Sequence, residues 1–252
     1  MGMNFLEREM MLAAQRFRQE QGLSATEPVA LRNLLAKLDV LTLFRPLGSD
    51  FSGMAMLRDD HRFMLINSTH SVGRQNFSIG HELYHLFIQK RQQAMVSFAG
   101  RFPEKDLDEL RADWFAAHLL LPEHGVYEQI PKSEYARDSL STATFLHIQH
   151  LYECSRPALL RTLKRLGLIG SAGYDRLYKD AYEQLANYGY TNYLYRLHSA
   201  SEPGNNYMIG EYGELAKALY DHELISETDY DGALQDSGVL DPLNVNNLDE
   251  EG

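Results

Sequence analysis

The sequence predicts an α+β fold that is predominantly helical. Apolar residues recur at helical spacing through much of its 252 residues. Short apolar runs bounded by turn residues, which are typical of strands, occur at residues 40–44, 51–57 and 62–67. After residue 131 the pattern is helical. We therefore expect a short sheet with helices beside it, followed by a helical C-terminal region.

Capping and turn residues define the first elements. A helix is predicted over residues 4–21, ended by Gly22, and a second over residues 28–38, opened by Pro28. The three strand-like runs follow. The last two flank an Arg-Asp-Asp-His turn and predict a β-hairpin. Its second strand could hold an extended peptide by pairing at a sheet edge.

The most specific motif is Ile-Gly-His-Glu-Leu-Tyr-His-Leu-Phe-Ile at residues 79–88. Two histidines four apart on a helix lie on one face, so His81 and His85 can reach the same metal ion. Glu82 lies next to the first histidine, where it could hold and deprotonate a water on that metal. The plainer interpretation is an amphipathic core helix whose histidines only form hydrogen bonds.

A third ligand has to come from elsewhere, because catalytic zinc usually has three protein ligands and a water. Residues 106–122 predict a second helix, separated from the first by a loop at residues 100–103. Glu109 and Asp113 share an alanine-rich face of this helix, which would allow close approach of the two helices. Glu109 could then bind the metal while Asp113 accepts the second N–H of a ligating histidine. The alternative is an ordinary acidic pair on a solvated face.

The two blocks resemble the ImmA/IrrE metallopeptidases, gluzincin-like zinc proteins of bacteria and their mobile elements. The family pattern is a strand ending in Asn, then Arg-Gln-x-Phe-Thr-x-Ala-His-Glu-x-Gly-His, then Glu-x-x-Ala-Asn/Asp-x-Phe-Ala-x-x-Leu-Leu-x-Pro. This chain offers Asn67, residues 74–85 and residues 109–122 in the same order. Gly80 stands where the family has Ala, and Tyr84 where it has Gly. The resemblance runs from about residue 3 to residue 169.

The resemblance implies zinc on His81, His85 and Glu109, with Glu82 as the general base. The tetrahedral intermediate of peptide hydrolysis needs a further hydrogen-bond donor. Three residues remain open for that role: Tyr127, His124 and Arg74. His118 is disfavoured because, nine residues from Glu109, it lies on the opposite side of its helix.

The same resemblance and the residue patterns suggest three parts. A zincin-like metallopeptidase domain is expected over residues 1–131, and a helix-turn-helix-like extension over residues 132–170. The remainder, residues 171–252, is expected to be helical, tyrosine-rich and then acidic, with short helices at residues 214–220 and 228–234. The end of the chain, at residues 244–252, is expected to be disordered.

The extension consists of two predicted helices, at residues 142–152 and 157–166, joined by a short turn in which Ser155 is a plausible N-cap. The second helix region carries four basic residues and could read DNA. Helix pairs of this kind are also ordinary packing units, and we regard DNA as the less favoured partner.

Composition and charge limit the compartment and the partners. The single cysteine, Cys154, excludes an internal disulfide framework and fits a reducing cytosol. No apolar run is long enough for a membrane span, so we expect a cytoplasmic protein without membrane contact. Residues 1–201 hold 23 basic and 22 acidic residues, whereas residues 202–252 hold Lys217 against 13 acidic residues. This acidic segment disfavours DNA and could attract a basic partner, or it is simply a solvated tail.

Two functional classes follow. In the first, the protein is a zinc endopeptidase that cleaves a regulatory protein, such as a helix-turn-helix repressor or an antitoxin. In the second, it is a zinc-binding regulatory or toxin-like module that acts by binding protein or DNA without proteolysis. The intact Glu82 favours the first class, because a binding module needs no general base.

Overall fold

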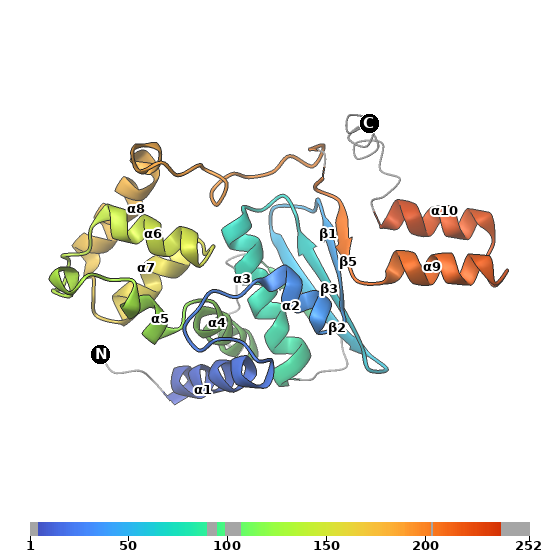
Figure 1. Ribbon diagram of the computed structural model, residues 1–252, viewed down its shortest axis with the longest axis horizontal. Coiled ribbons are helices and arrows are strands. Elements are labelled where there is room, and N and C mark those ends of the chain that lie inside the picture. The colour runs from blue at the N-terminus through green and yellow to red at the C-terminus, as the bar shows by residue number, and fades with distance from the viewer. Residues whose placement is uncertain (1–4, 90–94, 99–106, 203, 238–252) are drawn as a thin grey trace. The chain divides into compact units, whose positions relative to one another are not determined.

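The computed structural model describes residues 5–89, 95–98, 107–202 and 204–237, and it confirms the α+β fold (Figure 1). The chain forms two compact units that alternate along the sequence. The first comprises residues 1–29, 71–84 and 102–196, and the second comprises the rest. The predicted loop at residues 100–103 and the predicted disordered end at residues 244–252 lie outside the described residues. The division at residues 131 and 170 stays a prediction.

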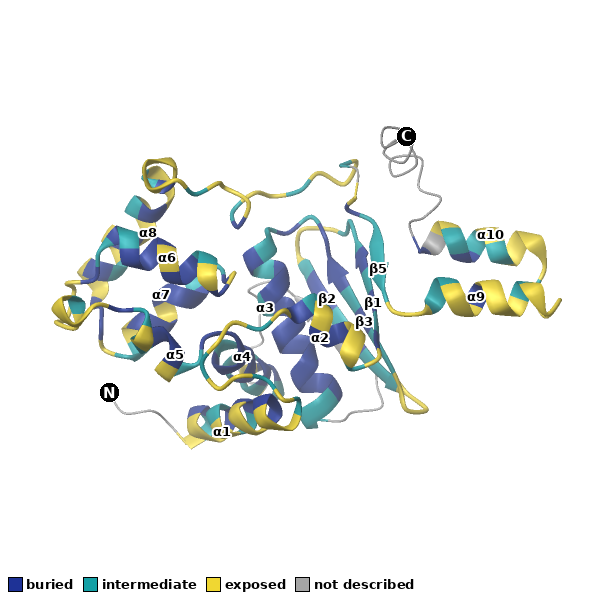
Figure 2. Cartoon of the chain, viewed as in Figure 1, coloured by how far each residue is buried: buried dark blue, intermediate teal, exposed yellow. Residues whose placement is uncertain are grey.

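Three helices make the core of the first unit: α1 (Phe5–Glu20), α3 (Val72–Leu83) and α4 (Leu107–Leu120). Helix α4 packs against both of the others, and the facing sides are buried (Figure 2). Phe115 of α4 meets Phe17 of α1 edge-to-face, with ring centroids 5.7 Å apart. A Cβ on Gly80 would lie 3.2 Å from the Cβ of Ala116. The small residues therefore bring α3 close to α4, as the alanine-rich face predicts.

The first unit also contains the helices α5 (Glu123–Glu128), α6 (Thr142–Leu151), α7 (Arg156–Arg165) and α8 (Ser171–Glu183). Short 3₁₀ turns lie at Lys132–Glu134 and Leu185–Tyr188. The predicted helix pair at residues 142–166 is present, and the Ser155 side chain accepts a hydrogen bond from the Ala158 amide as the N-cap. The helix predicted at residues 106–122 ends at Leu120, and Pro122 is the extended N-cap residue of α5.

The second unit is built on a five-stranded sheet in the order β4-β2-β3-β1-β5. Its strands are β1 (Val40–Arg45), β2 (Phe51–Arg58), β3 (His61–Asn67), β4 (Met95–Phe98) and β5 (Tyr207–Ile209). Helix α2 (Leu31–Lys37) packs beside β1 and begins three residues later than predicted, because residues 28–30 are not helical. The β2–β3 hairpin has the predicted turn, with Asp59 and Asp60 at positive φ.

Two features of the sheet differ from expectation. Strand β1 pairs in parallel with β3, so β3 has neighbours on both sides. The hairpin strand at residues 62–67 was expected to offer a sheet edge, and this expectation is wrong because its backbone groups already pair with β1 and β2. Strands β4 and β5 lie at the two ends of the order, and neither was predicted. Both are too short to show a clear alternation of apolar and polar residues.

Helices α9 (Tyr212–Asp221) and α10 (Glu227–Asp236) follow β5 and pack against each other. The expected helices at residues 214–220 and 228–234 are therefore present and slightly longer. Ser226 caps α10 in a capping box with Asp229, which satisfies two amides at the helix start. Tyr220 and Tyr230 stack between the two helices with ring centroids 4.9 Å apart.

Gly125 of α5 is closely packed against other residues of the first unit. A Cβ at this position would lie 2.1 Å from the Thr26 carbonyl oxygen and 2.5 Å from the Tyr152 hydroxyl, which donates to that carbonyl. We expect Gly125→Ala to lower the free energy of unfolding by about 1–3 kcal/mol, because backbone must move to admit the methyl group. Thermal unfolding of the purified variant measures this. Gly48→Ala is the matched control, since nothing lies within 4 Å of its added Cβ; equal melting temperatures for the two variants would contradict the packing described.

Candidate metal centre

The candidate ligands lie on two adjoining helices. Helix α3 begins after Ser71 and continues at Tyr84 into a π-helical turn, Tyr84–Gln89. Such turns are rare and are often found at functional sites. His81 is 3% exposed, Glu82 0%, His85 3% and Glu109 6%. Ionisable side chains this deeply buried require charged or hydrogen-bonding partners, because desolvation is costly.

His81 lies between two carboxylates of α4. Its Nε2 is 3.1 Å from Glu109 Oε2, and its Nδ1 is 2.9 Å from Asp113 Oδ1. Burial by itself would lower the pKa of His81, but the hydrogen bonds to Asp113 and Glu109 and the charge of Glu82 raise it to about 10. The metal-free imidazole is therefore protonated near neutral pH, and a metal at Nε2 has to displace that proton.

His85 has a matching arrangement one turn along. Its Nδ1 lies 2.6 Å from Gln89 Oε1. When Nδ1 donates to Gln89, the lone pair of Nε2 is available to a metal, just as it is in His81 when Nδ1 donates to Asp113. Sequence reasoning missed Gln89. Its position four residues after His85 was the available signal.

The structure brings the three predicted ligands together. One donor atom each of His81, His85 and Glu109 lies within 4.8 Å of the others, and all three residues are buried. Two imidazole nitrogens and one carboxylate are the donor set of catalytic zinc sites that keep a fourth position for water. The residues present therefore fit a zinc ion, with Asp113 and Gln89 orienting the two imidazoles.

The three candidate oxyanion donors lie in different places. Arg74 is on α3, two turns before His81, and burial lowers its pKa. No described residue pairs with its guanidinium. The Tyr127 hydroxyl donates to the Leu166 carbonyl at 3.2 Å, and His124 pairs with Glu128 at exposed positions of α5.

Tyr127 and His124 both line a cavity of about 800 Å³ in the first unit. Its walls come from α1, the loop after it, the end of α4 and the start of α5, and they include none of the four proposed site residues. His118 also lines this cavity, which agrees with its expected place on the far side of α4 from Glu109. Burial and the charge of Arg165 lower the pKa of His118 to about 3, so it stays neutral.

Cys154 and basic side chains of α7 make contacts within the first unit. Burial raises the pKa of Cys154 to about 12, so this thiol is not a nucleophile at neutral pH. Arg156 of α7 lies against the rings of Tyr178, Tyr182 and Tyr195. Arg165 pairs with Glu7 and Glu123. The Lys164 ammonium lies 5.8 Å from the centre of the Tyr174 ring. Three of the four basic residues proposed to read DNA therefore contact the protein itself.

Comparison with known proteins adds to this geometry. Residues 35–164 match the model of the Peptidase_M78 family, described as the IrrE N-terminal-like domain. The chain belongs to this family. The matched region contains both histidines, Glu82 and Glu109. No curated protein matches the chain significantly.

Membership in the IrrE N-terminal-like family confirms the predicted resemblance and shows a metallopeptidase-type function. The match begins within α2 and ends within α7, so it includes strands β1 to β4 and both helices of the candidate centre. Among the described residues, no helix combines the length and the apolar character that crossing a membrane requires.

Proposed function

We propose that this protein is a zinc-dependent endopeptidase that cleaves a regulatory protein, either a helix-turn-helix repressor or an antitoxin. The observation that carries the proposal is the fully buried carboxylate of Glu82 beside a set of three metal-ligand side chains. A site that only holds a structural metal gains nothing from an additional buried acid. A site that hydrolyses a peptide bond needs one as a base.

The zinc ion held by His81, His85 and Glu109 would supply Lewis acidity, polarising the scissile carbonyl and making a water more acidic. Glu82 accepts the proton of the attacking water and returns it to the leaving amine. Asp113 and Gln89 keep the two imidazoles in fixed orientations through Nδ1. Arg74, a cation on the same helix as His81, is our choice among the three candidates for stabilising the oxyanion.

The sheet offers a means of holding an extended substrate. Strand β4 is at the end of the strand order, and within the described part of the chain only β2 pairs with it. Its other edge can add a substrate strand through backbone hydrogen bonds, which hold a peptide without reading its sequence. Selection of one regulatory protein must then depend on contacts away from the scissile bond.

The proposal is tested by mapping new protein N-termini in cells that express wild-type protein or Glu82→Gln at equal levels. Labelling of free N-termini followed by mass spectrometry should reveal an internal cleavage of a DNA-binding regulator with the wild-type protein only. Glu128→Gln is the matched control, because Glu128 is an exposed glutamate of α5, and it should cleave normally. An identical set of N-termini from Glu82→Gln and wild type would leave the alternative, a zinc-binding module that acts without proteolysis.

A further inference from the structure

The helical hairpin of α9 and α10, residues 212–236, carries apolar residues that its own packing does not use. Ala216 and Tyr220 lie on the side of α9 that meets α10, and Ala216 is only 6% exposed. On another side, Leu215 is 60% exposed and Leu219 is 42% exposed, four residues apart and therefore adjacent. Leu224, in the turn between the helices, is 69% exposed. We call Leu215, Leu219 and Leu224 the leucine face.

The hairpin that carries the leucine face is strongly acidic. From residue 211 to residue 236 the sequence has eight acidic residues and one basic residue, Lys217. Lys217 itself pairs with Asp221 of the same helix. An exposed apolar stripe on an element whose charge is almost all of one sign is typical of a surface that binds a partner of the opposite sign. A second copy of the chain is a poor partner, because self-association would bring like charges together.

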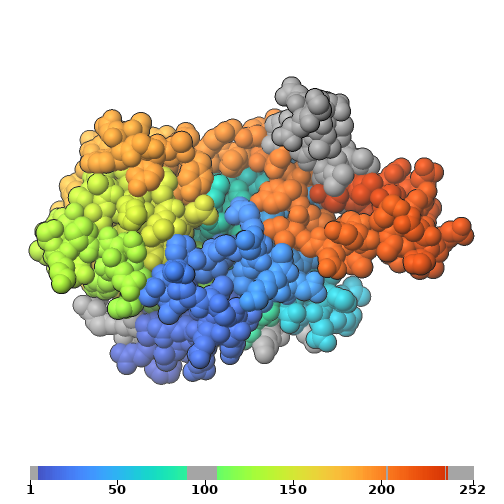
Figure 3. All heavy atoms as spheres, in the orientation of Figure 1, coloured from blue at the N-terminus to red at the C-terminus, as the bar shows by residue number. Residues whose placement is uncertain are grey.

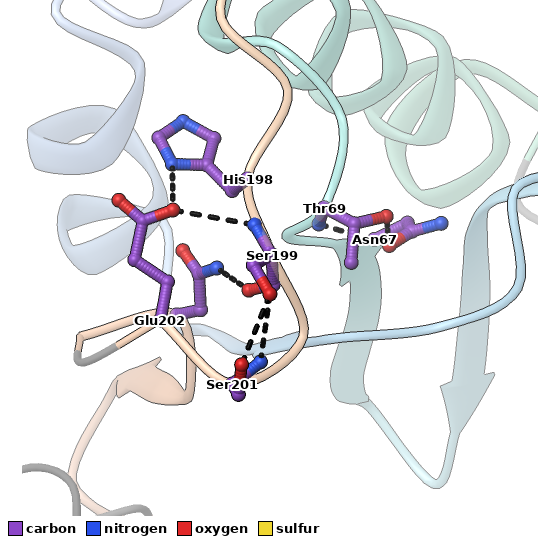
Figure 4. Close-up of polar contacts among 7 residues, drawn as sticks. Asn67, Thr69, His198, Ser199, Ser201 and Glu202 are labelled. Carbon is purple, nitrogen blue, oxygen red and sulfur yellow. Dashed lines mark hydrogen bonds and ion pairs between the residues drawn. The ribbon is translucent and has the colours of Figure 1, made fainter.

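The hairpin is joined to the five-stranded sheet through β5. Strand β5, directly before α9, pairs with β1 from Thr42↔Ile209 to Phe44↔Tyr207. Upstream of β5, the His198 amide donates to the Thr69 carbonyl at 2.9 Å. Figure 4 shows the turn at His198, Ser199, Ser201 and Glu202 beside Thr69 and Asn67, with the Glu202 carboxylate accepting from the Ser199 amide.

These contacts hold the segment before β5 against the loop at Asn67 and Thr69. Thr69 lies two residues before Ser71, the N-cap of α3. Asn67 secures the same loop, because its fully buried amide accepts from the Thr69 amide and donates to the Phe51 carbonyl at 2.8 Å. The space-filling view shows α9 and α10, coloured orange to red, at the surface (Figure 3). The hairpin thus follows directly from a paired strand of the sheet.

We propose that the hairpin docks the basic, DNA-contacting surface of the protein substrate. This proposal rests on the proposed function for the identity of the partner. A surface that binds DNA is rich in Lys and Arg, because it neutralises phosphates. The ammonium and guanidinium groups would pair with the hairpin carboxylates, while their aliphatic stems cover the leucine face. DNA and the peptidase would then compete for the same surface of the regulator.

The docking chemistry can be measured without knowing the substrate. The probe is a fluorescein-labelled synthetic 18-residue amphipathic helix of Leu and Lys, titrated with full-length Glu82→Gln protein by fluorescence anisotropy. Binding should weaken steeply with added salt, because exposed charges are screened. Leu215→Ser combined with Leu219→Ser leaves every charge in place and should raise Kd about tenfold or more, because both leucines lose their apolar contact.

Leu12→Ser combined with Leu197→Ser is the matched control, since these leucines are 43% and 70% exposed elsewhere, and its Kd should equal that of the parent. Equal Kd values for the two double variants would overturn the leucine face as a docking site. Light scattering tests for a dimer of this chain. A concentration-dependent dimer that dissociates only in Leu215→Ser/Leu219→Ser would overturn docking of a regulator and show that a second copy of the chain covers the leucine face.

A second experiment distinguishes a failure of this docking proposal from a failure of the proposed function. It uses the regulator identified by its new N-terminus, and a short peptide that spans only the scissile bond. Leu215→Ser/Leu219→Ser should raise KM for the whole regulator about tenfold and leave cleavage of the short peptide unchanged. A DNA duplex that carries the regulator's operator should inhibit cleavage of the whole regulator and leave cleavage of the short peptide unchanged. Equal losses on both substrates would reject docking while proteolysis stands, and absence of any cleavage would reject the proposed function while the probe titration still decides docking.

Discussion

Replacing Glu82 with glutamine is expected to lower kcat for peptide cleavage by about 10³-fold, within the range that general acid–base catalysis contributes. The reason is chemical, because the amide keeps the volume of the carboxylate but cannot accept the water proton. The side chain is fully buried, so bulk water offers no direct substitute for the base. Steady-state cleavage of a peptide spanning the mapped scissile bond gives kcat for both proteins.

Zinc content and melting temperature serve as controls for this variant, and both should stay near the wild-type values, since Glu82 is not among the proposed ligands. Glu128→Gln makes the same chemical change at an exposed position of α5 and should retain full activity. Wild-type kcat in Glu82→Gln would show that another group is the base and would remove the observation on which the proposed mechanism rests.

Replacing Glu109 with alanine is expected to weaken zinc binding by more than about a hundredfold, beyond the 10–100-fold typical of losing a residue that only orients a ligand. The substitution removes one of three proposed donors and leaves His81 without its carboxylate partner at Nε2. Competition against a chelator of known affinity, with metal analysis of the purified protein, measures the change.

A graded series makes this result specific. Asp113→Ala should weaken zinc binding less than Glu109→Ala, because Asp113 contacts Nδ1 of His81 and does not reach the donor cluster. Asp108→Ala, a neighbouring acid that pairs with Arg111, should bind zinc as the parent does. Full zinc content in Glu109→Ala would move the third ligand to another residue, with Asp113 the next candidate.

The spacing of residues within single segments was sufficient to predict much of the candidate metal centre. Two histidines four apart share a helix face whatever the rest of the chain does. The alanines around Glu109 predicted a close approach of α3 and α4, and the contact of Gly80 with Ala116 has that character. The hairpin turn, the Ser155 cap and the α6–α7 pair were likewise predicted from short-range signals. These are interactions between residues a few positions apart.

The sequence by itself therefore determined the fold class, the helices of the candidate centre and the chemistry of its residues. Only the tertiary structure decided that β1 pairs with β3, which removes that strand as a sheet edge and leaves β4 and β5 at the ends. It also decided that Gln89 orients His85 and that tyrosines distant in sequence cover Arg156. Strand order and side-chain contacts between distant segments depend on which pairings bury the most apolar surface in the whole chain, and periodicity within one segment does not contain that information.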